Sequence, residues 1–335
     1  MKKQIRTLSV VCSLLFLLGI ELLCNEVYII AKEFSCSETQ IPLSEYNIKM
    51  SSDESGKVYN YQINDKTDSH GKDYWEIKKY SYFDNQAVED IYSYDKWVKY
   101  VKKDEKSNKT IVVSEAKGKG KLRFTTYKKN GKKISAFIDA FSKKNNYIYN
   151  MSIQDVVIKG NKMFYAYIKD SKFAHIRCIN NKTGKLISDK VLKTKAKEFI
   201  EEIKIYSNEI YVQTENTVCV YSFGGKKRAT YTLPAGDIHY TKIGEYNYYS
   251  NFDDISISGK YIFFINSNGV YRCNTQKKQG FKLYYDASDD ANFKQCKVYD
   301  ICATGKNEFV VMFVEKENID MQMPSKIVRY MGNFN

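Results

Sequence analysis

The chain has 335 residues, of which 43% are hydrophobic, 15% aromatic and 27% charged. This composition is too apolar and too aromatic for a disordered protein, and the length suits two ordinary domains or one large β-domain. The formal charge of +14 excludes an acidic, solvating protein, and the charged fraction excludes a protein with many membrane spans.

The first 30 residues predict an export segment. A basic start with Lys2, Lys3 and Arg6 precedes a nearly continuous apolar run over residues 7–24. This order is typical of a signal peptide or of a single hydrophobic anchor helix. Since positive charge stays on the cytoplasmic side, the rest of the chain is expected outside the cytoplasm. The protein would be secreted if the leader is cleaved, and tethered to the membrane through residues 7–24 if it is retained.

One pattern then recurs along the chain: an acid, a turn residue five positions later, and a short apolar strand. The acids of the five copies are Asp90, Asp155, Glu202, Asp254 and Asp300. A sixth copy turns at Gly56 and lacks the acid. Successive turns lie about 50 residues apart on average, although two gaps measure 39 and 65 residues. The apolar runs are rich in β-branched and aromatic residues and too short for bundle helices, so they predict strands.

Further turns follow several copies, for example at residues 169–171 and 181–184. Each unit therefore holds about four short strands, which is the pattern of a propeller blade. In these repeats the chain resembles bacterial extracytoplasmic β-propeller proteins with degenerate repeats, over about residues 40–335. The resemblance implies an all-β propeller fold. The repeats favour six blades, and the leader adds one N-terminal hydrophobic helix. Seven blades are the alternative, because residues 122–137 contain an additional hairpin-like stretch, and a pair of β-sandwiches is another.

The expected organisation is a leader over residues 1–30, a linker over 31–39 and a propeller over 40–335. The final repeat lacks an outer strand. The stretch Gln40–Met50, in which Tyr46, Ile48 and Met50 alternate, is expected to supply it. A ring needs such a closure because open sheet edges promote aggregation.

Little catalytic chemistry is visible in the sequence. Paired carboxylates can hydrolyse glycosidic bonds, but an acid that recurs at one place in every blade is expected to be structural, by capping a turn or pairing with the next blade. The three histidines lack metal-ligand spacing and no nucleotide-binding loop is present, so neither a metal nor a cofactor is expected. Acidic stretches at 65–73 and 286–290 are read as surface loops.

Six cysteines follow the leader. Cys178, Cys219 and Cys273 occupy equivalent places in successive repeats and are expected to be buried free thiols. Cys296 and Cys302 are the pair best suited to a disulfide, if one forms in an oxidising compartment.

Basic clusters at predicted turns are the most conspicuous surface feature. The candidates for ligand binding are Lys226, Lys227 and Arg228, and the alternative is that such clusters are ordinary solvated turns. Outside a bacterial cell, a basic surface would meet anionic envelope polymers, and nucleic acid is not an expected partner. The sequence therefore favours a non-catalytic extracytoplasmic binding or scaffolding module for such a polymer or for a protein partner. A polysaccharide-active enzyme with carboxylates at the propeller mouth and an accessory subunit of an envelope complex are the alternatives.

Overall fold

The computed structural model describes 15 stretches of the chain: residues 33–40, 46–47, 49–52, 56–83, 88–94, 96–104, 108–116, 121–128, 132–140, 151–194, 198–235, 240–243, 246–249, 253–315 and 326–333. Residues Cys36–Met331 form one compact unit. Residues 33–35 and 332–333 are the described parts of a second unit. The predicted leader and its hydrophobic helix lie outside the described residues.

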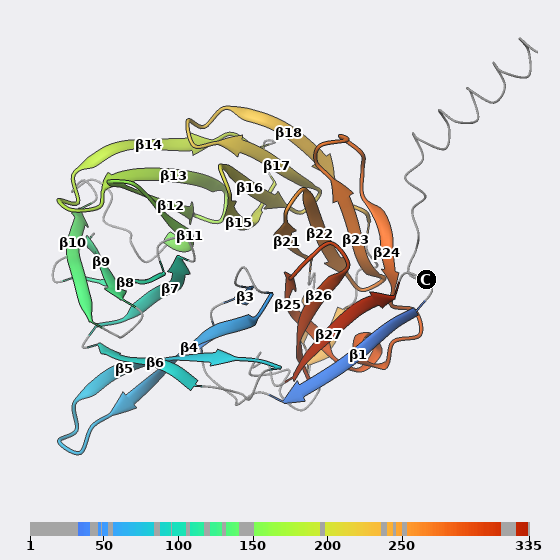
Figure 1. Cartoon of the computed structure of the whole chain (residues 1–335), viewed down its shortest axis with the longest axis horizontal. Coiled ribbons are helices and arrows are strands. Elements are labelled where there is room, and N and C mark those ends of the chain that lie inside the picture. The colour runs from blue at the N-terminus through green and yellow to red at the C-terminus, as the bar shows by residue number, and fades with distance from the viewer. Residues whose placement is uncertain are drawn as a thin grey trace, which may run out of the picture. The chain divides into compact units, whose positions relative to one another are not determined.

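The described chain is built almost entirely of antiparallel strands (Figure 1). The first three blades, in chain order, are as follows. Blade 1 contains β2 (Tyr46–Asn47), β3 (Ser51–Ser52), β4 (Val58–Thr67), β5 (Asp73–Ser81) and β6 (Val88–Tyr94). Blade 2 contains β7 (Val98–Asp104), β8 (Lys109–Glu115), β9 (Lys121–Lys128) and β10 (Lys133–Ala140). Blade 3 contains β11 (Met151–Lys159), β12 (Lys162–Lys169), β13 (Phe173–Asn180) and β14 (Leu186–Leu192).

The second half of the unit repeats this arrangement. Blade 4 contains β15 (Ile200–Tyr206), β16 (Glu209–Thr214), β17 (Thr217–Ser222) and β18 (Lys227–Thr232). Blade 5 contains β21 (Asp254–Ser258), β22 (Tyr261–Asn266), β23 (Gly269–Asn274) and β24 (Lys282–Asp286). Blade 6 contains β25 (Lys297–Ala303), β26 (Glu308–Val314), β27 (Lys326–Asn333) and β1 (Glu33–Gln40). A separate hairpin of β19 (Tyr240–Ile243) and β20 (Tyr246–Tyr249) precedes blade 5, and a short helix, α2 (Ala291–Gln295), precedes blade 6.

The first strands of the blades contact one another in a closed circuit. β7 contacts β11, β11 contacts β15, β15 contacts β21, and β21 contacts β25. Blade 1 closes the circuit, because its β3 contacts β25 of blade 6 and its β4 contacts β7 of blade 2. Cys36–Met331 is therefore a six-bladed propeller, in which blade 1 lies opposite blade 4, and the prediction of an all-β propeller with six blades is confirmed.

The hydrophobic core lies between neighbouring blades. One cluster joins blades 2 and 3 through Phe124 of β9 and Tyr165 of β12. Comparable clusters join blades 3 and 4, blades 4 and 5, blades 6 and 1, and blades 1 and 2. Blades 1 to 4 therefore have apolar clusters on both faces, which explains why their central strands are continuous apolar runs rather than strictly alternating ones.

Two details of the sequence prediction need correction. The repeat copy at Asp90 is wrong, because Asp90 lies on β6, the outer strand of blade 1, whereas blade 2 begins at β7. The closing strand is β1, from the range that we assigned to the linker, and not Gln40–Met50. β2 and β3, at residues 46–52, instead pair with β4 as the first strands of blade 1.

Within the residues described above, no helix combines the length and apolar character that a membrane span requires.

Candidate functional site

The recurring acids meet at the centre of the ring. On the first strand of blades 3, 4 and 6, a register shift directly precedes the acid, at Asp155, Glu202 and Asp300. Asp254 occupies the same position on β21, where it pairs with Ile265. Such a bulge redirects the side chain that follows it. In blade 2 the equivalent residue is Tyr100, which explains why a search for acids missed this repeat.

Two lysines hold the carboxylates together. The Lys49 Nζ lies 2.8 Å from the Asp254 Oδ2 and 3.2 Å from the Glu202 Oε1. The Lys204 Nζ lies 3.3 Å from the Glu202 Oε2 and 3.6 Å from the Asp254 Oδ1. Because Lys49 belongs to blade 1 and Glu202 to the opposite blade 4, the contact between these two residues spans the ring. We call Lys49, Glu202, Lys204, Asp254 and Asp300 the hub cluster.

The pKa values of the three hub carboxyl groups are shifted in different directions. Burial and the charge of Asp254 raise the pKa of Asp300 to about 8. The same two causes raise the pKa of Glu202 well above its usual value. Burial opposes the ionisation of Asp254, but the charges of Lys204 and Lys49 outweigh it and hold the pKa of this carboxyl well below its usual range. The negative charge of the cluster is therefore favoured on Asp254, whereas burial and the charge of Asp254 disfavour ionisation of Glu202 and Asp300.

The remaining acid joins three blades. The Asp155 Oδ1 accepts a hydrogen bond from the Lys102 Nζ of blade 2 at 2.5 Å. Its Oδ2 accepts one from the backbone N–H of Ile205 of blade 4 at 2.6 Å. On the far side of the ring, Asp300 of blade 6 accepts a hydrogen bond from the backbone N–H of Met50 of blade 1. These contacts confirm the prediction that the acids pair with neighbouring blades.

A cavity of about 680 Å³ lies against this cluster. First strands of all six blades line it. Its basic side chains are Lys49, Lys99, Lys102, Lys103, Lys159 and Lys204, and its acidic ones are Asp104, Asp155 and Glu202. The lysines thus outnumber the carboxylates two to one, and concave sites with a few converging polar groups are the usual places for ligands.

The hub carboxyl groups do not have the geometry of a glycosidase pair. Glu202 and Asp254 share a hydrogen bond, and both contact the same Lys49 Nζ. Glycosidases instead place their two carboxyl groups about 5 Å or more apart, on either side of the sugar bond. Among the residues that the structure describes, no group of three or more histidine, cysteine, aspartate or glutamate side chains could hold a metal ion.

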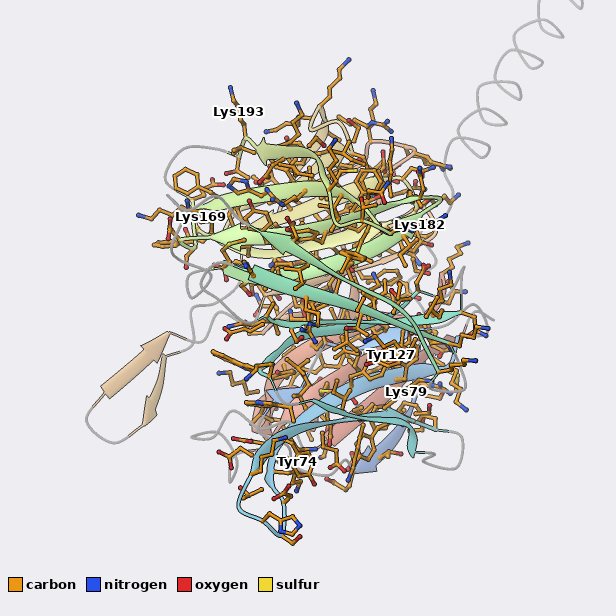
Figure 2. The ribbon with its side chains drawn as sticks, turned by 90° about the vertical axis from the view of Figure 1, so that its left-hand side faces the viewer. Tyr74, Lys79, Tyr127, Lys169, Lys182 and Lys193 are labelled. Carbon is orange, nitrogen blue, oxygen red and sulfur yellow. The ribbon has the colours of Figure 1, made fainter. Side chains whose placement is uncertain are left out.

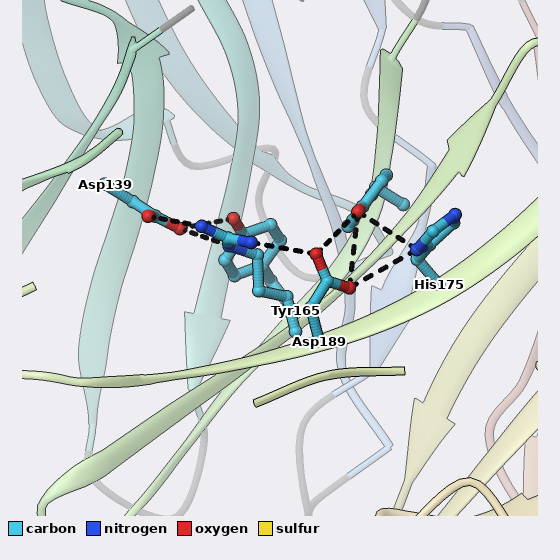
Figure 3. Close-up of polar contacts among 6 residues, drawn as sticks. Asp139, Tyr165, His175 and Asp189 are labelled. Atoms are coloured by element: carbon cyan, nitrogen blue, oxygen red, sulfur yellow. Dashed lines mark hydrogen bonds and ion pairs between the residues drawn. The ribbon is translucent and has the colours of Figure 1, made fainter. Parts of the chain in front are cut away.

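A second polar cluster lies away from the cavity (Figure 3). Arg177 on β13 donates to both oxygens of Asp139 on β10, from Nε at 2.7 Å and from Nη2 at 2.9 Å. Its Nη1 also donates to the Asp189 Oδ2 at 2.8 Å. The Tyr165 hydroxyl donates to Asp139, and the His175 Nδ1 lies 3.3 Å from the Asp189 Oδ1. This cluster fastens the outer strand of blade 2 to blade 3, so we read it as structural.

The predicted basic site lies far from the hub. Lys226 precedes β18, and Lys227 and Arg228 lie on it, at the exposed outer edge of blade 4. Arg228 forms an ion pair with Glu209 at 3.0 Å. Basic side chains are spread over the exterior: Figure 2 shows Lys169 and Lys193 at one end of blade 3 and Lys182 at the other end.

The six cysteines within the described residues are free thiols. Cys178, Cys219 and Cys273 are buried, as we expected. Cys296 directly follows α2, whereas Cys302 lies near the far end of β25 and borders the cavity. The structure does not bring these two together, since the extended chain between them spans about 20 Å.

Sequence reasoning missed the lysines of the hub. Lys49 and Lys204 carried no signal of their own in a chain with 53 basic residues. Lys204 lies two positions after a predicted acid and is repeated by Lys102 two positions after Tyr100. Side chains two positions apart on a strand point to the same face, so this spacing could have revealed Lys204 and Lys102.

Comparison with known proteins finds similar solved structures but no matching family. No family model and no curated protein matches the chain. Among solved structures, the chain is similar to YCF48 bound to a D1 peptide, with 10% identity, a TM-score of 0.47, and 90% of this chain and 96% of that chain covered. It is similar to the Neurospora crassa Pan2 WD40 domain, with 8% identity, a TM-score of 0.45, and coverage of 91% and 97%. It is also similar to the β-propeller domain of the Trilobed protease from Pyrococcus furiosus, with 9% identity, a TM-score of 0.44, and coverage of 81% and 79%.

Proposed function

We propose that this propeller is a non-catalytic binding module that holds an anionic ligand in its central cavity. The observation that carries the proposal is the excess of lysines over carboxylates among the side chains that line the cavity. These lysines come from four blades, so a ligand at the hub could contact several of them at once.

The leader indicates where this binding takes place. Its charged start and apolar run support an extracytoplasmic protein, secreted or tethered through residues 7–24. The ligand would then be an anionic group of the bacterial cell envelope, such as a phosphate or carboxylate on a polymer. Lysine suits this role because it is a point charge that attracts such groups without requiring one fixed geometry.

The experiment compares the cavity with the outer basic site. Inositol hexasulfate and glycerol-phosphate oligomers serve as probes in titration calorimetry at low and high salt. One variant carries Lys103→Gln and Lys159→Gln, which remove two cavity lysines that are not members of the hub cluster. The matched control carries Lys226→Gln and Lys227→Gln, which removes the same charge from the outer edge of blade 4.

We expect the cavity variant to bind at least about tenfold more weakly, because hydrogen bonds to charged groups contribute about 1.5–3 kcal/mol each. The outer variant should change the affinity less than about twofold. The reverse order would move the site to Lys226, Lys227 and Arg228, and a failure of both probes to bind at low salt would refute the proposal.

A further inference from the structure

The hub carboxylates and an incoming anion need the same ammonium groups. Lys49 and Lys204 are both held between Glu202 and Asp254, and both border the cavity. Lys49 reaches these partners from blade 1, across the ring, and its side chain remains 42% exposed. It is therefore accessible to a ligand in the cavity while it also neutralises Asp254.

An anion that draws these lysines away leaves a buried carboxylate behind. Asp254 is only 3% exposed, and an ionised carboxylate without a partner is costly at such a place. Protonation is the cheapest response, because it removes the charge without moving the strand. Glu202 and Asp300 show the same tendency, since burial and the charge of Asp254 raise the pKa of both carboxyl groups.

We infer that binding of an anion in the cavity is coupled to uptake of a proton by the hub cluster, so that the ligand binds more weakly as the pH rises. The inference rests on the proposed function and assigns a regulation to the same site. Its geometric basis is that the ammonium groups that neutralise Asp254 are also cavity groups. A ligand bound at the outer basic site would have no such coupling.

Proton uptake by the hub cluster has to be distinguished from proton uptake by other titratable groups nearby. Burial raises the pKa of Tyr299 and of Cys302 to about 12 and that of Tyr100 well above its usual value, so these three stay neutral below pH 9. Asp155 forms an ion pair with Lys102 at 2.5 Å and is not a member of the hub cluster. Burial raises the pKa of Glu201, and burial with the charge of Glu201 raises that of Asp253 to about 6. Asp253 is therefore the neighbour that needs a control.

Calorimetry on the unmodified chain measures the proton directly. Inositol hexasulfate is a suitable probe because sulfate esters do not titrate between pH 5 and 9. Titrations at pH 7 in two buffers with different ionisation enthalpies give the number of protons taken up. We expect about one proton, together with an affinity that falls about tenfold per pH unit, as linkage requires for one proton.

Two variants locate the proton. The Asp254→Asn protein should take up fewer protons when it binds the probe. It should also bind the probe about tenfold more tightly at pH 7, because Lys49 and Lys204 no longer form ion pairs with residue 254. The adjacent Asp253→Asn should keep the proton uptake of the unmodified chain.

Binding without proton uptake by the unmodified chain, with an affinity that does not depend on pH, would overturn this inference and leave the proposed function intact. No binding at any pH would refute both. Because the proton count needs no variant, the test remains decisive even where Asp254→Asn fails to fold.

Discussion

Buried charged side chains connect the blades of this propeller by forming ion pairs with partners on other blades. Arg177 is the strongest example, because it is 5% exposed and binds Asp139 with two hydrogen bonds. Asp189 is a second charge of this cluster that its partners stabilise. Burial opposes its ionisation, but hydrogen bonds from His175 and Arg177 outweigh burial and lower its pKa.

Arg177→Met should therefore destabilise the protein strongly. The change leaves Asp139 buried without its cation, and loss of one partner of a buried ion pair costs about 3–5 kcal/mol. Chemical denaturation followed by fluorescence measures the free energy of unfolding. The control is Arg228→Met, which breaks an exposed pair with Glu209 and should cost less than about 1 kcal/mol. Equal effects of the two changes would contradict the structural role of the Arg177 cluster.

For single residues, the sequence revealed the acids at the centre of the ring but not the lysines that bind them. Asp155, Glu202, Asp254 and Asp300 were found by their constant distance from a turn, which is a local property. Lys49 contacts Glu202 across more than 150 residues, and nothing near Lys49 in the sequence indicates that contact. Long-range pairs of this kind come from ring closure, which a single sequence does not display.

The hairpins are the elements that set the register of each blade, and their turns constrain single positions. Gly269 opens β23 with a φ of +143°, a conformation that side chains rarely adopt. A β-carbon at this position would overlap the carbonyl oxygen of Tyr285 on β24. The turn between β22 and β23 therefore requires glycine.

We expect Gly269→Ala to lower the free energy of unfolding by at least about 2 kcal/mol, because strained backbone and a steric overlap act together. Gly280→Ala is the matched control, since no atom lies within 4 Å of its added β-carbon. Thermal denaturation of both variants gives the comparison. A Gly269→Ala protein as stable as the Gly280→Ala protein would mean that β24 can shift away at little cost.

Elements with strong apolar periodicity were predictable, and those without it were not. The turns at 160, 207, 259 and 305 were located correctly because apolar strands flank them. Blade 2 was misplaced because Tyr100 occupies the position at which blades 3 to 6 carry an acid, and the pattern was matched to Asp90 instead. β1 is mostly polar, with the sequence EFSCSETQ, so no local signal marked it as a strand.

For the whole molecule, closure of the ring depends on one strand from the N-terminal side. β1 is the outer strand of blade 6 and pairs with β27, so the first and last described strands lie side by side (Figure 1). β27 itself is well anchored on its other side, where Tyr330 is fully buried and stacks on Phe309. Without β1, β27 would present an open edge next to this apolar core.

Replacement of Glu33–Gln40 by a glycine–serine linker of equal length should therefore weaken the entire ring and not blade 6 alone. Several ladder hydrogen bonds of about 1 kcal/mol each would be lost, so the free energy of unfolding should fall by about 3 kcal/mol or more. The unfolding midpoint in denaturant and the tendency to aggregate measure the effect. Glu38→Gln is the control, because Glu38 is exposed and its partner Lys326, at 3.3 Å, keeps a second contact with Glu315, so the midpoint should stay nearly unchanged. Since Lys49 of blade 1 and Asp300 of blade 6 meet at the hub only in a closed ring, the linker variant should also lose the anion binding proposed for the cavity. A linker variant with unchanged stability and binding would show that the contacts between first strands close the ring without β1.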